Sequence, residues 1–223
     1  MRLAVSTILL ASAGALFGQT SVENRLDEAA TVFSEVMSMS DKAVPQELLD
    51  RSQCVVVVPG MKKGAFIVGA KYGKGFLSCR KKSGTGWTGP GAIRVEGGSF
   101  GFQIGGSETD VLLLVMNERG VQRLMSSKFT LGGDASVAAG PVGRTATAQT
   151  DAYMTAEILS YSRSRGVFAG IALNGATLRP DQEDNQSLYG RAIENKEIIN
   201  KEVPPPKAAE KLISLFNKYS GRK

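Results

Sequence analysis

The sequence predicts an α+β fold: a strongly curved, glycine-rich, mainly antiparallel sheet or barrel-like core with packed helices. The main observation is the stretch from Gly84 to Arg144, where glycines fall between apolar and β-prone residues instead of forming one linker block. Glycine weakens a strand unless a bulge, a tight bend or a close backbone approach requires it. Amphipathic helical patterns lie at both ends of the chain, and 223 residues with 42% apolar composition suffice for one sizeable core.

The first part of the chain predicts two helices followed by three strands. From Val22 to Met39, apolar residues recur at helical spacing and form one stripe. Asp41–Leu49 predicts a shorter helix, since its proline suits a first turn. Runs of β-branched and aromatic residues separated by Gly/Lys turns then indicate an antiparallel meander. Its strands are Gln53–Val58, ended by Pro59-Gly60, and then Ala65–Tyr72 and Gly75–Arg80.

The rest of the chain continues the sheet and then returns to helices. Asn117 is a good cap for a helix that we expect to reach Ser127. A polar loop later precedes a predicted helix from Asn185 to Asn200. The expected extended segments are Ala92–Val95, Ser99–Ile104, Thr109–Met116, Ser136–Val142, Ala146–Met154, Glu157–Ser162 and Val167–Leu173.

Composition divides the chain into three parts. In residues 1–18 one arginine precedes an apolar run that is short for a membrane span, which is the layout of a secretory signal peptide. We therefore expect export to the periplasm, the cell envelope or the medium; an uncleaved anchor or a buried N-terminal helix is the alternative. Residues 19–202 form the domain, and residues 203–223 form a proline spacer and a detachable amphipathic helix. The apolar side of that helix carries Leu212, Leu215, Phe216 and Tyr219.

The chain has only two cysteines, Cys54 and Cys79. In an exported protein an even pair is a disulfide candidate. Closing a loop of this length would stabilise the fold by about 3 kcal/mol. Two buried thiols in neighbouring strands are the alternative.

The residues that most catalytic mechanisms need are scarce. The sequence has no histidine, which excludes Ser-His-Asp and Cys-His mechanisms and removes the commonest metal ligand. Glu108 and Asp110 would point to the same face of a strand, so a carboxylate hydrolase stands as the weakest hypothesis. The glycine-rich segments match neither nucleotide-binding pattern, GxGxxG or GxxxxGK[ST]. We expect no catalytic residues, no metal site and no cofactor.

Positive charge is concentrated in one segment. The chain carries a net charge of +6, and from Met61 to Lys82 it has seven cations and no acid. Since these cations cluster in the turns of the predicted meander, we expect several of them to share one end of the sheet. There each could add about 1 kcal/mol of attraction to an anionic bilayer; a solvated rim that protects strand edges is the alternative. No nucleic-acid-binding module is recognised, and nucleic acid is not an expected partner. The candidate lipid-binding residues are Lys62, Lys63, Lys71, Lys74, Arg80, Lys81 and Lys82.

Several segments, taken in order, resemble one family. They are VPQELLDRSQCVVVVP, KGAFIVGAKYGKGFLSCR, GWTGPGAIRVEGGSFGFQIGGSETDVLLLV, FTLGGDASVAAGPVGR and YSRSRGVFAGIALNG, with Asn185 and Tyr189 closing the set. Over residues 48–189 the chain resembles the SYLF-domain family, also named for the actin-binding domain of its fungal members. The resemblance implies a non-enzymatic module that binds phosphoinositides and other anionic lipids and, in eukaryotic relatives, actin filaments. It implies no defined set of binding residues.

These features lead to one expected function and one rival. We expect an exported bacterial member of this family that attaches to anionic, phosphoinositide-like membrane surfaces through its basic face, aided by the C-terminal helix. The rival is a structural or protein-interaction module, similar to the actin-binding relatives, whose tail helix docks to a protein of the cell envelope.

Overall fold

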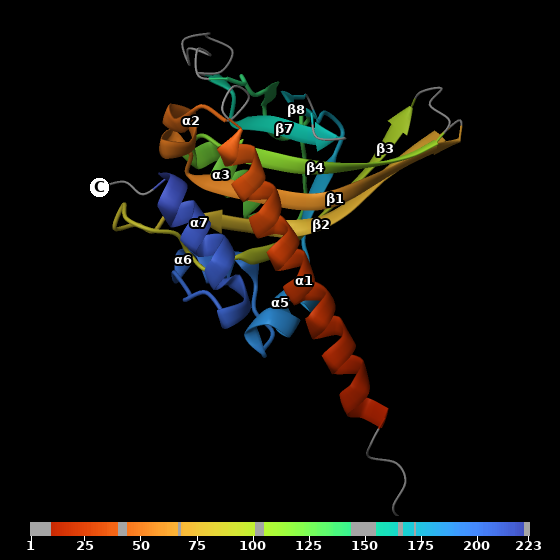
Figure 1. Cartoon of the computed structure of the whole chain (residues 1–223), viewed down its shortest axis with the longest axis vertical. Helices are drawn as coiled ribbons and strands as arrows, with labels where there is room; N and C mark the ends of the chain where they lie inside the picture. The colour runs from red at the N-terminus through yellow and green to blue at the C-terminus, as the bar shows by residue number, and fades with distance from the viewer. Residues whose placement is uncertain are drawn as a thin grey trace, which may run out of the picture.

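One curled sheet forms the middle layer of the molecule, and helices cover both of its faces (Figure 1). The structure, a computed structural model, describes residues 10–39, 44–66, 68–100, 105–143, 155–164, 167–171 and 173–220. The sheet bends into an open half-barrel, and the predicted α+β class with a strongly curved, mainly antiparallel sheet is confirmed.

The helices lie mainly at the two ends of the chain. The first two are α1 (Leu10–Ser38) and α2 (Gln46–Arg51). The predicted cap of α3 (Glu118–Leu124) is present, since the Asn117 side chain accepts a hydrogen bond from Gly120 N (3.0 Å). The C-terminal helices are α5 (Gln182–Tyr189), α6 (Asn195–Asn200), the 3-10 turn η1 (Lys207–Ala209) and α7 (Glu210–Ser220).

One predicted helix is two helices in the structure. The segment from Asn185 to Asn200 is interrupted after α5, where Gly190 adopts a left-handed conformation (φ 67°). Glycine adopts this conformation without steric cost and commonly ends a helix. The prediction of one continuous helix there is therefore wrong.

The sheet holds nine strands in the described part of the chain, in the spatial order β5-β9-β3-β2-β1-β4-β7-β6, with β8 also paired to β7. Every strand pair is antiparallel except β6 with β7. The strands are β1 (Cys54–Phe66), β2 (Val68–Cys79), β3 (Gly91–Phe100), β4 (Gly105–Val115), β5 (Phe129–Thr130), β6 (Val137–Ala139), β7 (Ile158–Ser164), β8 (Val167–Gly170) and β9 (Thr177–Pro180).

One long hairpin, β1–β2, replaces the shorter predicted strands, and the long strands β3 and β4 flank it, β3 beside β2 and β4 beside β1. Pro59-Gly60 does not end β1; the register with both neighbouring strands shifts there, which makes a bulge. Gly60 has φ 56° at the bulge, a conformation that favours glycine. β2 likewise continues through the predicted turn at Gly73-Lys74. The predicted strand Ala146–Met154 lies outside the described residues, and β9 was not predicted.

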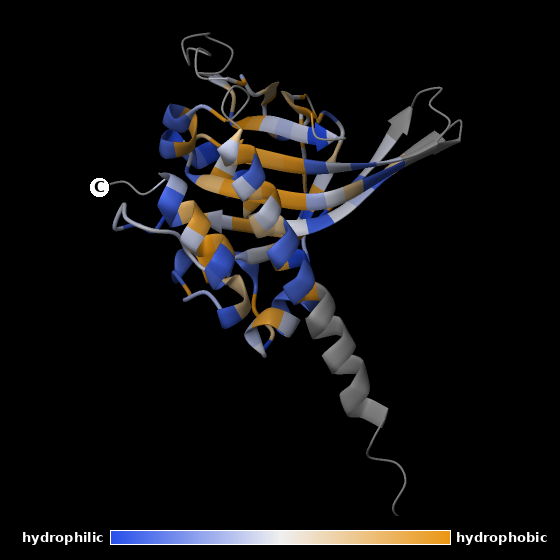
Figure 2. Cartoon of the chain, viewed as in Figure 1, coloured by the Kyte–Doolittle hydropathy of each residue, from blue (hydrophilic) through white to orange (hydrophobic). Residues whose placement is uncertain are grey.

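Apolar side chains on the two faces of the sheet build two cores. On one face, Val55 packs in a cluster with side chains of α1, α2 and α7. On the other face, Val56 packs in a cluster with side chains of α3 and α6. Figure 2 shows the apolar parts of the strands beneath α1 and α7. This alternation along β1 explains why its continuous β-branched run is buried on both sides.

The C-terminal helix differs from the detachable helix that we predicted, because it packs on its own domain. Leu212 and Phe216 are each only 1% exposed. The Phe216 ring meets Phe33 of α1 edge-on at 4.7 Å between centroids and lies 5.4 Å from the Trp87 ring. These apolar residues are therefore occupied within the domain.

Part of the predicted signal peptide lies outside the described residues. Residues 1–9 are not described, and from Leu10 the backbone is helical and continuous with the rest of α1. Among the described residues, no helix has both the length and the apolar character needed to cross a bilayer.

The structure joins Cys54 and Cys79 in a disulfide between β1 and β2. The two residues are direct partners in the strand register, and both are buried. The sequence separation is 25 residues. In the chain-entropy description, closing a loop of this length stabilises the fold by about 3 kcal/mol.

Candidate functional site

The ends of four strands continue the sheet beyond the helices. We define the hairpin extension as residues 62–66, 68–72, 96–100 and 105–108, which belong to β1, β2, β3 and β4. Figure 1 shows these strands reaching past the helical layer, and Figure 2 shows them changing from apolar to polar on the way. No described side chain of the extension belongs to either apolar core.

Three of the seven candidate cations lie on this hairpin extension. Lys63 on β1 is the direct cross-strand partner of Lys71 on β2. Lys62 lies between Tyr72 on β2 and Glu108 on β4. Because successive residues of a strand point to opposite faces, Lys63 and Lys71 share one face of the sheet.

The Lys63–Lys71 pair carries unbalanced positive charge. Like charges directly opposite one another destabilise a sheet. Burial of Lys63 and repulsion by the Lys71 ammonium lower the pKa of Lys63 from its ordinary value. Within the described residues, no carboxylate forms an ion pair with either lysine. An anion bound over this face would relieve the repulsion.

Beyond the lysines, β1, β2 and β3 end in apolar residues, whereas β4 begins with two glycines. Phe66 is the register partner of Val68, which in turn pairs with Phe100 on β3. Small residues such as Gly64 and Ala70 separate these ends from the lysines. On the body side of Lys71, level with Lys62, Tyr72 carries an aromatic side chain that is 48% exposed. Along the strands the order is therefore charged, small and then apolar.

Lys74, by contrast, is held in an ion-pair network inside the body. Its ammonium lies 2.8 Å from Asp181 Oδ2 and 3.2 Å from Asp184 Oδ1. Arg25 of α1 binds the other oxygen of Asp184 at 2.5 Å. Burial alone would lower the pKa of Lys74, but the two carboxylates outweigh it and raise that pKa. Lys74 therefore connects β2, α5 and α1 and is not available to a membrane.

Arg80 is also structural, since its guanidinium is buried among backbone carbonyls. Nε donates to Ser52 O (2.8 Å), and Nη1 donates to Ser220 O (2.8 Å). Nη2 donates to Leu49 O (3.0 Å) and Asp50 O (3.1 Å). These carbonyls lie at the C-terminal ends of α2 and α7, where a cation also complements the helix dipole.

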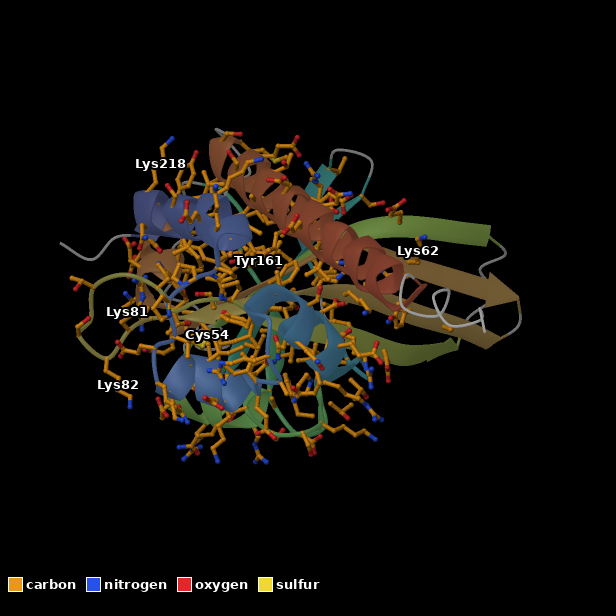
Figure 3. All side chains as sticks on the ribbon, turned by 90° about the horizontal axis from the view of Figure 1, so that it is seen from below. Cys54, Lys62, Lys81, Lys82, Tyr161 and Lys218 are labelled. Atoms are coloured by element: carbon orange, nitrogen blue, oxygen red, sulfur yellow. A yellow bond between two sulfur atoms is a disulfide. The ribbon has the colours of Figure 1, made fainter. Side chains whose placement is uncertain are left out.

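Lys81 and Lys82 follow the end of β2 at Cys79, whereas Lys71 lies near the start of that strand and Lys62 and Lys63 lie beside it on β1. Figure 3 shows Lys62 on the projecting strands and Lys81 and Lys82 at the opposite end of the molecule. Of the seven candidate cations, Lys62, Lys63 and Lys71 therefore lie at one end of the sheet, and the other four do not. β2 does not turn at Gly73-Lys74, so its two ends carry different groups of lysines.

An acidic pocket of about 640 Å³ lies between α1 and the bulge of β1. Glu108 and Asp110, the two acids weighed for hydrolysis, both line it. Asp110 accepts hydrogen bonds from Gly60 N (2.9 Å) and Arg163 Nε (2.9 Å). Burial raises the pKa of Asp110; the Gly60 N–H opposes this, and the nearby Glu108 adds to it. The other charged groups in the lining are Asp27, Glu28, Glu35 and Arg163, so acids outnumber cations.

The hydrogen bonds of Asp110 indicate that it has a structural role. Arg163 on β7 binds Asp110 on β4 and also pairs with Glu35 on α1. This network fixes α1 against the sheet and occupies both oxygens of Asp110. Among the described residues, no group of three or more acidic or cysteine side chains is placed to hold a metal ion.

Sequence reasoning missed the apolar part of the hairpin extension. Phe66 and Phe100 belong to patterns that read as core strands, whereas the structure places their backbone at the ends of β1 and β3. It also missed Arg119 and Arg123, which lie one turn apart on α3. The spacing of these arginines after the Asn117 cap was the available signal.

Comparison with known proteins places these features in a family. Residues 96–219 match the family model described as "Ysc84: Las17-binding protein actin regulator". The rat SH3 domain-containing YSC84-like protein 1 is 32% identical over 191 residues, which are 84% of this chain and 56% of that protein. Protein YSC84 of Saccharomyces cerevisiae is 32% identical over 180 residues, 79% of this chain and 38% of that protein.

The chain thus spans between about a third and two thirds of the length of the curated relatives it matches. The family description names a regulator and a binding partner, and not a reaction. The ordered segments from residue 48 to 189 had implied the same relationship, and the family model covers more than half of the chain. The chain therefore belongs to the Ysc84 family, the family of the SYLF domain.

Proposed function

We propose that this domain is a non-catalytic interaction module that attaches to anionic membrane surfaces through the hairpin extension. The observation that carries the proposal is the facing pair Lys63 and Lys71, which has no carboxylate partner and lies behind apolar strand ends. Each such cation contributes about 1 kcal/mol near an anionic bilayer. Apolar and aromatic residues ahead of the cations can enter the headgroup region.

A second candidate is binding to an acidic protein surface. The family description and the yeast relative LAS seventeen-binding protein 3 name protein binding, and the same lysines with the exposed Tyr72 would suit an acidic partner. Docking through the tail helix is not proposed again, because Leu212 and Phe216 are buried against α1 and Trp87.

Vesicle binding tests the first candidate. Replacing Lys62, Lys63 and Lys71 by glutamine should weaken co-sedimentation with phosphatidylcholine vesicles that contain phosphatidylserine by about 100-fold, since three cations of about 1 kcal/mol each are lost. The matched control replaces Lys81, Lys82 and Lys218 by glutamine. It removes the same charge at the other end of the molecule (Figure 3) and should change binding little. Added salt should weaken binding by the wild-type chain.

Two results would overturn this proposal: equal binding to vesicles without phosphatidylserine, or an equal loss in both triple variants. A pull-down that depends on Lys63 and Lys71 without any vesicle binding would favour the protein partner.

We also propose export with removal of residues 1–18, which the oxidised Cys54–Cys79 pair supports, because such pairs persist outside the reducing cytosol. The intact mass of the native protein should correspond to a chain that begins at Gln19 and resists alkylation without a reductant. A mass that includes Met1, or cysteines that alkylate in the unfolded, unreduced protein, would contradict export.

A further inference from the structure

A basic cleft lies at the corner between α3 and β5, far from the hairpin extension. It has a volume of about 460 Å³, within the range typical of small-molecule sites. We call it the α3 cleft; it is lined by Arg119, Gln122, Arg123, Ser126, Lys128, Phe129 and Asp134. Three cations against one acid give the lining an excess of positive charge.

Local structure holds these cations on one side of the cleft. Arg119 and Arg123 are four residues apart on α3, so their side chains are neighbours on the helix surface. The Ser126 hydroxyl donates to Arg123 O (2.6 Å) and lies 3.0 Å from Lys128 O, which fixes the turn after the helix. Phe129, only 2% exposed, anchors that turn in the core.

The two arginines of the α3 cleft differ from the other arginines of the described chain. Arg25, Arg51, Arg94, Arg163, Arg179 and Arg191 pair with carboxylates, and Arg80 binds carbonyl oxygens. Within the described residues, Arg119 and Arg123 have neither kind of partner. Among the arginines that the structure describes, the cleft therefore brings together the two that have neither a carboxylate nor a carbonyl partner.

We propose that the α3 cleft binds a compact polyanion with at least two phosphate groups. A guanidinium presents parallel N–H donors that match two oxygens of one phosphate. Two guanidiniums one helical turn apart can each take one phosphate group, and the Lys128 ammonium adds a point charge beside them. The amide of Gln122 can donate to an oxygen between the phosphates.

This step rests on the function proposed above: with the hairpin extension at the membrane, the α3 cleft lies at the opposite end of the sheet, and its ligand is then a soluble molecule. α3 follows Val115 at one end of β4, whereas the hairpin extension contains Gly105 at the other end. Eleven strand residues separate the ends by about 35 Å. A bilayer that contacts the hairpin extension would leave the α3 cleft open to solvent.

A crossed pair of variants tests this site separately from the membrane proposal. Isothermal titration calorimetry with inorganic tripolyphosphate should show saturable binding to the wild-type chain and weaker binding of inorganic phosphate. Arg119→Gln with Arg123→Gln should weaken tripolyphosphate binding by about 100-fold, tenfold for each guanidinium, while vesicle binding stays unchanged. The control, Lys63→Gln with Lys71→Gln, removes the same charge and should do the reverse.

The proposal is overturned if tripolyphosphate gives no saturable heat, or if both double variants lose affinity for it equally. Loss of vesicle binding in the arginine variant would also overturn it, since the cleft would then serve a membrane. Unfolding curves of the arginine variant should match those of the wild type, because both side chains are exposed.

Discussion

Replacing Arg80 by alanine should lower the free energy of unfolding by about 3–5 kcal/mol, the range for removing one partner of a buried charged network. The reason is the set of carbonyl oxygens that the guanidinium binds at the ends of α2 and α7. Without it these acceptors are buried with too few donors, and each orphaned group costs about 1–3 kcal/mol. Urea denaturation followed by circular dichroism measures the change.

Two further variants show whether this loss belongs to the guanidinium. Arg80→Lys keeps the charge but not the planar fork, so it should recover only part of the stability. Lys82→Ala, two residues on and exposed, should change the unfolding free energy by no more than about 0.5 kcal/mol. A loss below about 1 kcal/mol in Arg80→Ala would show that water replaces the guanidinium and that Arg80 is not a structural residue.

Phe216→Ala should have an effect of similar size, about 3–5 kcal/mol of unfolding free energy, because truncating a buried phenylalanine leaves a cavity. The ring fills the space between Phe33 and Trp87 and is 1% exposed. If α7 belongs to the domain, as the packing indicates, its loss must weaken the whole fold. Chemical denaturation should then show a single transition at a lower midpoint.

The neighbouring Asn217→Ala supplies the control on the same helix. Asn217 is exposed, and alanine favours a helix, so stability should stay within about 0.5 kcal/mol. A Phe216→Ala protein that unfolds with the wild-type midpoint would mean that α7 behaves as the detachable helix that the proline spacer first indicated.

Local patterns were enough to predict the fold class and most elements. Apolar spacing indicated α1, and the Asn117 cap correctly indicated α3. Local patterns gave a wrong prediction where the same residues are compatible with two backbone structures. Pro59-Gly60 ends many strands, but here the pair forms a bulge within β1, because β4 and β2 pair with that strand on both sides of it.

The candidate site was harder to predict, because charge in a segment does not reveal which partners the fold supplies. Lys74 and Arg80 contribute to the same basic stretch as Lys63, yet Asp181 and the Ser220 carbonyl, more than 100 residues later, neutralise or occupy them. No short-range pattern contains that information. Lys63 lies directly opposite Lys71 because of the β1–β2 register, and the bulge shifts that register.

β1, β2 and β4 run without interruption from the disulfide end of the body into the hairpin extension. This continuity fixes the orientation of the body relative to the hairpin extension. Their ladders of hydrogen bonds join the described part of the hairpin extension directly to the body of the sheet. If the domain attaches through the hairpin extension, the twelve residues of β2 place Cys79 about 35 Å from the point of attachment. The elements at that far end, which are α2, α3 and the last turn of α7, would then stay exposed to solvent and accessible to other binding partners.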